Sequence, residues 1–181
     1  MASLHSMSGT DLADVARLAA AGDPESFAVL VRATQADVAR ACSALVDHAS
    51  VDDLVQETYL RVFRALPTYN AHATARTWIL GIVRHVCIDE IRRRTRRRSL
   101  LRRLPSQPEL THPVSATDLE LLIRALPLEQ REAFVLTQLV GLRYDEAAAA
   151  CGCPVGTIRS RVSRARLTLA NAIHAAEERA E

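Results

Sequence analysis

A short helix, a glycine-containing turn and a second helix are encoded by residues 144–166, which read YDEAAAACGCPVGTIRSRVSRAR. Helical spacing gathers aliphatic side chains on one side of the second helix, namely Val155, Ile158, Val162, Ala165 and Leu169. The other flanks carry hydroxyl and guanidinium groups, which suit phosphate and guanine contacts: Thr157, Arg159, Ser160, Arg161, Arg164 and Arg166. We therefore predict a helix-turn-helix whose second helix enters the major groove of duplex DNA. The alternative is an Arg-rich helix that only faces solvent.

Upstream of this motif the sequence predicts two further helices and, before them, a linker. A capping box at Thr117 and Glu120 precedes a short apolar helix, and a second helix is expected over residues 128–139. Residues 99–116 have little apolar periodicity and contain three prolines, at Pro105, Pro108 and Pro113. A domain boundary is therefore expected in this stretch.

The first half of the chain predicts four amphipathic helices. Asp23 and Pro24 are typical of an N-cap and a first helical position, and they start a helix that runs towards Val46. Ser50 and Asp53 form a variant capping box for the next helix. Residues 67–77 are expected to form a loop, after which an apolar helix starts at about Trp78 and continues into an Arg tract.

The fold class that follows is all-α. We expect two small helical domains, residues 11–98 and residues 117–175, joined by the Pro-containing linker 99–116, with the helix-turn-helix in the second domain. The length of 181 residues allows two such domains, and the 49% of hydrophobic residues is typical of a folded protein.

The distribution of charge points to a polyanionic partner. All 23 basic residues are Arg, and eight of them fall within residues 92–103, a stretch without any acid. Guanidinium groups bind phosphate and guanine in bidentate geometry. The helix that ends in this tract could follow a row of phosphates, and the alternative for the tract alone is a nonspecific basic arm. Trp78, at the start of that helix, is expected to be a core residue rather than a stacking platform.

The helix after Ser50 carries an acidic and apolar cluster that comprises Asp53, Leu54, Gln56, Glu57 and Tyr59. Asp53 and Glu57 are four residues apart and share a face, so their mutual repulsion favours binding of a basic partner. The alternative is that the acidic groups only complement the helix dipole, which fits Asp53 better than Glu57.

No catalytic, metal or membrane-spanning motif is present. The spacings of the four cysteines (Cys42, Cys87, Cys151, Cys153) and of His48, His72, His85 and His112 match no common metal site or nucleophile motif, so no cofactor or metal is expected. We expect the cysteines to be small apolar side chains. Without an apolar run of about 18 residues or a signal peptide, a cytoplasmic protein with no membrane partner is expected.

Four segments, in this order, resemble the extracytoplasmic-function (ECF, group 4) class of bacterial RNA polymerase sigma factors in the sigma-70 family. They are residues 52–61 (DDLVQETYLR), residues 76–93 (beginning RTWIL and ending DEIRR), residues 126–132 (LPLEQRE) and residues 156–166 (GTIRSRVSRAR). The resemblance covers about residues 11–175. It differs from the family at His85, where many members carry Asn, and at Ala147, where a larger aliphatic is common.

The resemblance implies a role for each segment. The acidic cluster at 53–59 would bind the β′ clamp helices of core RNA polymerase, and the helix-turn-helix domain would recognise minus-35 DNA and contact the β flap. Minus-10 DNA would contact Arg76, Trp78, Arg84, His85, Arg92, Arg93, Arg94 and Arg96. An anti-sigma factor is a further candidate partner.

The predicted function is therefore a promoter-specificity subunit, which is not itself an enzyme. The alternative is a stand-alone helix-turn-helix regulator with an N-terminal sensing or dimerisation domain. That alternative leaves the Arg tract and the acidic helix unexplained.

Overall fold

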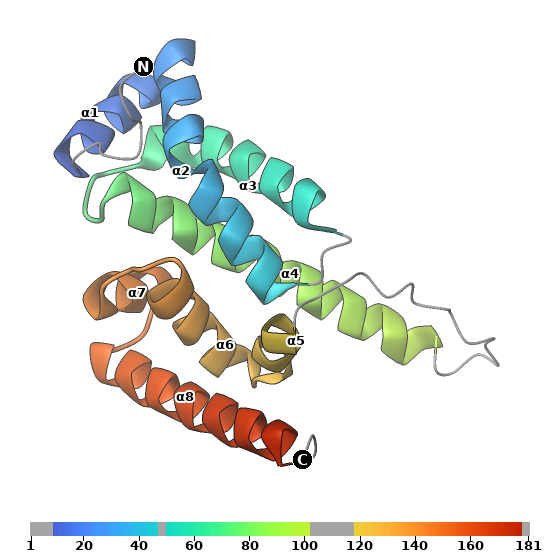
Figure 1. The fold of residues 1–181 in the computed structure, drawn as a ribbon. Helices are drawn as coiled ribbons and strands as arrows, with labels where there is room; N and C mark the ends of the chain where they lie inside the picture. Colours follow the sequence, from blue (N-terminus) through green and yellow to red (C-terminus); the bar gives the residue numbers. More distant parts are fainter. Residues whose placement is uncertain (1–8, 47–49, 102–117, 179–181) are drawn as a thin grey trace.

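The computed structural model describes residues 9–46, 50–101 and 118–178, and within them every regular element is helical (Figure 1). The first half contains α1 (Gly9–Ala20), α2 (Pro24–Leu45), α3 (Val51–Ala65), a 3-10 turn η3 (Leu66–Thr68) and α4 (Ala75–Leu101). The second half contains α5 (Asp118–Ala125), α6 (Leu128–Phe134), a π-helical turn η4 (Val135–Leu139), α7 (Tyr144–Cys151) and α8 (Val155–Glu177). The all-α prediction is confirmed.

The start of α2 follows the sequence signals. Gly22 adopts a positive φ of 96°, which ends the preceding turn, and the Asp23 carboxylate accepts a hydrogen bond from the Ser26 backbone N–H at 2.9 Å. This bond lowers the pKa of Asp23, because it favours the charged form. Pro24 takes the first helical position, where its missing N–H leaves no bond unmade.

Three local predictions require correction. The capping box at Ser50 and Asp53 does not form, since the Ser50 hydroxyl makes no cap bond and instead accepts from the Arg94 guanidinium. Helix α4 begins at Ala75 rather than Trp78, because Thr74 Oγ1 accepts from the Thr77 backbone N–H at 3.1 Å and so caps the helix. The same helix reaches Leu101, inside the stretch assigned to the linker. Thr117, with its predicted capping box, and residues 102–116 lie outside the described residues.

The two halves share one buried core. Helices α1 to α4 surround side chains such as Leu30, Val62 and Ile79, while α5 to α8 surround Leu136 and others, and the buried cluster runs through both. Figure 1 shows α6 and α7 lying between α4 and α8, so the second half packs on α4 with α8 outermost. None of the described helices is long and apolar enough to cross a membrane.

Candidate nucleic-acid and polymerase interfaces

Helix α8 presents the predicted DNA side chains outward. Ile158, Val162, Ala165 and Leu169 are buried, which confirms the apolar stripe. Of the six predicted minus-35 residues, Thr157 and Arg161 are half-buried, and the other four are exposed: Arg159, Ser160, Arg164 and Arg166. The turn before α8 ends α7 at Gly152, which has a positive φ of 63°. The helix therefore has one face in the core and one in solvent.

Two of the α8 arginines are engaged by neighbouring side chains. Arg161 donates to Glu129 at 2.6 Å, and Arg166 donates to the Gln138 amide oxygen at 2.6 Å. Glu129 is 72% exposed, so its ion pair with Arg161 is a weak surface contact. Arg159 and Arg164 have no hydrogen-bond or ion-pair partner within residues 9–46, 50–101 and 118–178.

The predicted minus-10 face of α4 lies against the second half of the chain. Arg76 donates to Asp37 on α2 at 2.7 Å and to the Val140 backbone carbonyl at 2.6 Å. Arg84 donates to Glu132 on α6 at 3.0 Å. The guanidinium groups of Arg76 and Arg84, which were expected to bind DNA, are thus already bound within the chain.

The Arg84–Glu132 pair is largely shielded from solvent, because the Glu132 side chain is only 2% exposed and that of Arg84 18%. Burial raises the pKa of Glu132, and the nearby Arg84 opposes that shift. A second cross-contact is made by Arg131, which donates to the carbonyl of Leu45 at the end of α2 at 2.9 Å. Burial lowers the pKa of Arg131, with a smaller contribution from Arg124. These contacts join helices that are far apart in sequence.

The π-helical turn η4 directs the Val140 carbonyl towards Arg76. The Val140 N–H donates to the Val135 carbonyl five residues earlier, and the Leu142 N–H donates to Leu136 at 2.9 Å. Gly141 follows with a positive φ of 81°, which reverses the chain into α7. Because the helix ends at this point, the Val140 carbonyl is available to Arg76.

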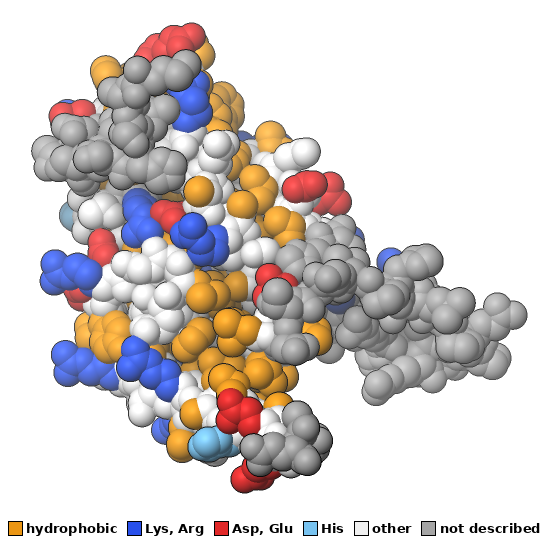
Figure 2. All heavy atoms as spheres, viewed as in Figure 1, with side chains coloured by type: hydrophobic (Ala, Val, Ile, Leu, Met, Phe, Trp, Pro, Cys, Tyr) orange, Lys and Arg blue, Asp and Glu red, His pale blue; other side chains and the backbone are white. Residues whose placement is uncertain are grey.

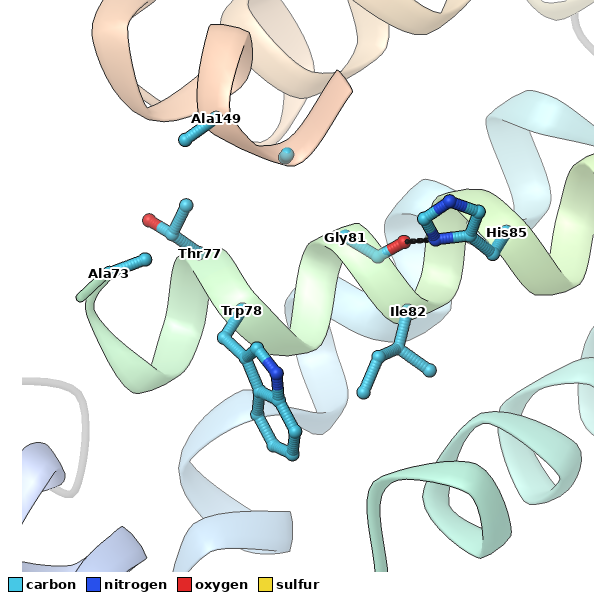
Figure 3. Close-up of a pocket in the computed structure, with 8 residues that line it drawn as sticks. Ala73, Thr77, Trp78, Gly81, Ile82, His85 and Ala149 are labelled. Carbon is cyan, nitrogen blue, oxygen red and sulfur yellow. Dashed lines mark hydrogen bonds between the residues drawn. The ribbon is translucent and has the colours of Figure 1, made fainter. Parts of the chain in front are cut away.

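A small cavity lies where α4 meets α7 (Figure 3). Its volume is about 240 Å³. Thr77, Trp78, Gly81, Ile82 and His85 from α4 line it, together with Ala73, Ala149 and Ala150. A Cβ placed on Gly81 would lie 3.8 Å from the Ala150 backbone, so the two helices are in van der Waals contact there.

Trp78 packs beside the core, as expected for it. The indole is half-buried against the hydrophobic cluster, and its ring centroid lies 5.1 Å from that of Tyr69. The Tyr69 hydroxyl donates to the Ala73 carbonyl at 2.8 Å, so this ring pair shapes the loop before α4. A role of Trp78 in base contact stays a prediction.

The charge of the Arg tail of α4 is partly neutralised by Glu90, a role that was not predicted from the sequence. Glu90 accepts from Arg93 at 2.7 Å and from Arg94 at 2.5 Å, and the Arg93 hydrogen bond lowers the pKa of Glu90. Arg92 and Arg96 are exposed and have no hydrogen-bond or ion-pair partner in the described part of the chain. Arg97 is likewise exposed and has no such partner in that part of the chain, so these three arginines of the tail are well placed to bind phosphate.

The acidic cluster on α3 divides into an exposed and an internal set. Asp53 and Gln56 are exposed, whereas Leu54 is a buried core residue. The Tyr59 hydroxyl hydrogen-bonds with Thr34 Oγ1 at 2.9 Å, and burial raises the pKa of Tyr59 to about 12. Both side chains point into the domain, and a part for Leu54 and Tyr59 in polymerase binding stays a prediction.

Glu57 has a basic partner within the chain. Arg61 donates to Glu57 at 2.7 Å and to Asp89 on α4 at 2.9 Å, and these two bonds raise the pKa of Arg61. The repulsion between Asp53 and Glu57 is therefore partly relieved without an external partner. Interaction with the helix dipole remains an interpretation for Asp53 alone.

Two exposed apolar residues on α3 were not predicted as site residues from the sequence. Leu60 is 51% exposed and Phe63 is 61% exposed, and both lie on the same side of the helix as Asp53 and Gln56. The signal was present, since residues 53, 56, 60 and 63 follow helical spacing. Large apolar side chains next to exposed acids are typical of a protein-binding surface.

The cysteines fall into a buried pair and a half-buried pair. Cys42 and Cys87 are buried with their sulfurs 3.8 Å apart, and the Cys42 contact together with burial raises the pKa of Cys87. Cys151 and Cys153 are half-buried, and burial raises the pKa of Cys151 to about 11. Within the described residues, no group of three or more His, Cys, Asp or Glu side chains could hold a metal ion.

Comparison with known protein families finds a match for each half of the chain. Sigma-70 region 2 matches residues 30–97, and Sigma-70 region 4 matches residues 116–169. The ECF RNA polymerase sigma factor SigC of Mycobacterium tuberculosis is 47% identical over 154 residues, which cover 82% of this chain and 83% of that protein. The chain belongs to the ECF sigma factors of the sigma-70 family.

Solved structures agree with this assignment. CnrH, in complex with the cytosolic domain of CnrY, has a TM-score of 0.71 at 28% identity and covers 90% of this chain and 96% of its own. The sigma factor RpoE of Bartonella quintana, in complex with the anti-sigma factor NepR, has a TM-score of 0.69 at 27% identity over 80% of this chain and 94% of its own.

The family determines the function. This ECF sigma factor is a promoter-specificity subunit that binds core RNA polymerase and promoter DNA and initiates transcription, and it is not an enzyme. The alternative of a stand-alone regulator is set aside, because residues 30–97 match region 2 rather than a sensing or dimerisation domain.

Proposed function

We propose that residues 11–98 bind polymerase and unpaired minus-10 DNA, that residues 117–175 bind duplex minus-35 DNA, and that the chain first adopts a closed arrangement in which the N-terminal half of α4 is covered while the minus-35 face of α8 is accessible. The closed arrangement is defined by the contacts Arg76–Val140, Arg84–Glu132 and Arg131–Leu45. The observation that carries this proposal is that Arg76 and Arg84, in the N-terminal half of α4, bind the second half of the chain, whereas Arg159 and Arg164 on α8 are exposed.

Polymerase binding is the event expected to open the chain. The α3 surface made by Asp53, Gln56, Leu60 and Phe63 lies outside the closed contacts, so polymerase can bind it first. Separate sites for the two domains on polymerase would then hold α4 and α8 apart, and each would bind its DNA element at high effective concentration. Arg76, Arg84, His85, Arg92 and Arg96 would face the minus-10 strand in that state.

An anti-sigma factor is proposed to act on the closed arrangement. Two similar sigma factors were solved with CnrY and with NepR, and the first superposes on both halves of this chain. A partner that spans the halves would add its own contacts to the closed form and so oppose opening. Because polymerase and promoter DNA lie in the bacterial cytoplasm, we propose that the chain acts there.

The test of these assignments is a pull-down of core polymerase followed by run-off transcription. Asp53→Arg and Phe63→Ala should each lose core binding without loss of fold, since both side chains are exposed. Arg92→Ala with Arg96→Ala should keep core binding but impair promoter opening. Tight sequence-specific DNA binding by the free chain, with no effect on core polymerase, would contradict the proposal.

A further inference from the structure

The tail of α4 repeats one short motif. Residues 92–95 read RRRT and residues 96–99 read RRRS, so a hydroxyl side chain follows three arginines twice in succession. Thr95 and Ser99 are both exposed. Ile91 is the last described residue of α4 that packs against the core cluster, and Figure 1 shows the C-terminal end of α4 projecting beyond the other helices. Local unwinding of this tail to fit another protein's active site therefore costs little apolar burial.

Helical spacing places Thr95 beside two arginines that are not engaged elsewhere. Thr95 lies three residues after Arg92 and directly before Arg96, and neither arginine has a hydrogen-bond or ion-pair partner in the described part of the chain. The Thr95 hydroxyl donates to the Ile91 carbonyl at 2.9 Å, which holds the side chain along the helix. Glu90, the acid that neutralises part of the tail, lies five positions earlier, about 140° around the helix. A negative charge at Thr95 would therefore lie near two guanidinium groups and away from Glu90.

These features suit a phosphorylation site. Protein kinases select substrates by charge pattern, and three arginines directly before the acceptor fit a kinase whose substrate groove is acidic. The reaction transfers the γ-phosphoryl group of ATP to Thr95 Oγ1, with ADP as the leaving group and the hydroxyl proton passing to the catalytic base of the kinase. The phosphothreonine carries a charge of about −1.5 to −2 at pH 7 and three acceptor oxygens. Arg92 and Arg96 can both donate to these oxygens, and such charge-assisted hydrogen bonds are strong.

We propose that Thr95 is a phosphorylation site for an arginine-directed Ser/Thr protein kinase, and that its phosphate competes with DNA for Arg92 and Arg96. The effect on DNA rests on the proposed minus-10 role of α4. Ser99 follows the same motif, but Arg92 lies two turns away from it, so a phosphate on Ser99 would bind only Arg96 of the two. Because neither the α3 surface nor the α8 arginines include Thr95, polymerase binding and minus-35 binding should continue.

The first experiment identifies the modified residue. The full chain is incubated with ATP and an extract of the bacterium that encodes it, and cleavage after glutamate should then release residues 91–109, which contain both Thr95 and Ser99. Fragmentation by mass spectrometry should find the phosphate on Thr95. The phosphate should persist in Thr168→Ala, the matched control, because Thr168 is an exposed threonine of α8 without an arginine three residues before it. A wild-type peptide without phosphate, or with phosphate on Ser99 in place of Thr95, would overturn the proposal.

The second experiment measures what the phosphate does to DNA binding. Holoenzyme is assembled from the phosphorylated chain and from Thr95→Ala treated in the same way, and each binds a single-stranded minus-10 probe over a range of salt concentrations. Loss of two phosphate contacts, at about 0.7 each, should lower the log-log salt slope by about 1.4 and weaken the affinity roughly tenfold. Pull-down of core polymerase and binding of minus-35 duplex should not change.

Arg92→Ala with Arg96→Ala separates the two ways in which this proposal can fail. Phosphorylation should add little to the effect of the double substitution, because the phosphate acts through these two side chains. If the double substitution weakens probe binding but the phosphate does not, competition for the arginines is refuted while the minus-10 role of α4 stands. If neither change has an effect, the proposed DNA role of the tail is wrong, and the effect inferred for the phosphate is refuted with it.

Discussion

Helices α4 and α8 both carry arginines suited to DNA, yet Arg76 and Arg84 in the N-terminal half of α4 are covered by the second half of the chain, whereas Arg159 and Arg164 on α8 are exposed. In α8 the buried stripe occupies one side, and outside it the second half of the chain binds Arg161 and Arg166 but leaves Arg159 and Arg164 exposed. In α4, Ile79 and Val83 belong to the buried core while Thr77, Gly81 and Arg84 meet α6 and α7, so opposite sides of its N-terminal half are in contact. Figure 2 shows apolar and basic side chains interspersed over one face of the molecule. Whether a basic helix can bind DNA therefore depends on which helices pack against it as well as on its charge.

The largest expected effect comes from locking the closed arrangement. Gly81→Cys with Ala150→Cys, in a chain where Cys151 and Cys153 are Ala, places two thiols where a Cβ on Gly81 would lie 3.8 Å from the Ala150 backbone. Under a thiol oxidant the disulfide should abolish binding of a minus-10 single strand while binding of minus-35 duplex continues. Gel-shift assays measure binding of both DNA probes, and reduction of the disulfide with dithiothreitol should restore binding of the minus-10 strand. If the cross-linked chain still bound the minus-10 strand fully, the proposal that the second half of the chain blocks DNA binding by α4 would be wrong.

On α8, Arg164→Ala should weaken minus-35 binding by about 1 to 3 kcal/mol and relax one base position if the side chain contacts a base. Arg161→Ala serves as the comparison, because Arg161 must first leave Glu129. Affinities for a set of single-base variants distinguish the two, since a phosphate contact would weaken all sequences equally.

Removing the buried acid should shift the closed arrangement towards the open one. Glu132→Gln leaves Arg84 without its ion-pair partner, and loss of one member of a buried pair is strongly destabilising. If the substitution destabilises the closed form by about 1.4 kcal/mol relative to the open form, the affinity for the minus-10 strand rises about tenfold. Titration with labelled single strand tests this, with Glu129→Gln as the exposed control and thermal unfolding as the check on the fold. An unchanged affinity would show that Glu132 does not hold α4 closed.

The smallest effect concerns the loop that leads into α4. Ala71 has a positive φ of 59°, a conformation that disfavours a side chain. Ala71→Gly should raise the free energy of unfolding by about 0.5 to 1 kcal/mol, since relief of this strain exceeds the added entropy of the unfolded chain. Urea denaturation measures the change. A destabilised variant would show that the loop is held by contacts rather than strained.

Local signals predicted most of the helices and the motif around α8. The Asp23 cap, the glycine stops and the stripe of Ile158 and Val162 depend on residues within a few positions of one another. The prediction at Ser50 was wrong, because Arg94, distant in sequence, binds its hydroxyl. The local capping signal at Thr74 and Thr77 was present in the loop stretch and was missed.

The sequence by itself determined the helical class and which side of α8 faces outward, because both follow from helical periodicity, and the identities of its residues carry the family motifs. Only the tertiary structure decided that Arg84 meets Glu132, that Arg76 meets the Val140 carbonyl, and that Leu54 points inward. Periodicity shows that a helix face is apolar or basic, but it does not specify what packs there. A guanidinium suited to phosphate binds a buried carboxylate or a helix-end carbonyl equally well, and which one it meets depends on how distant segments pack.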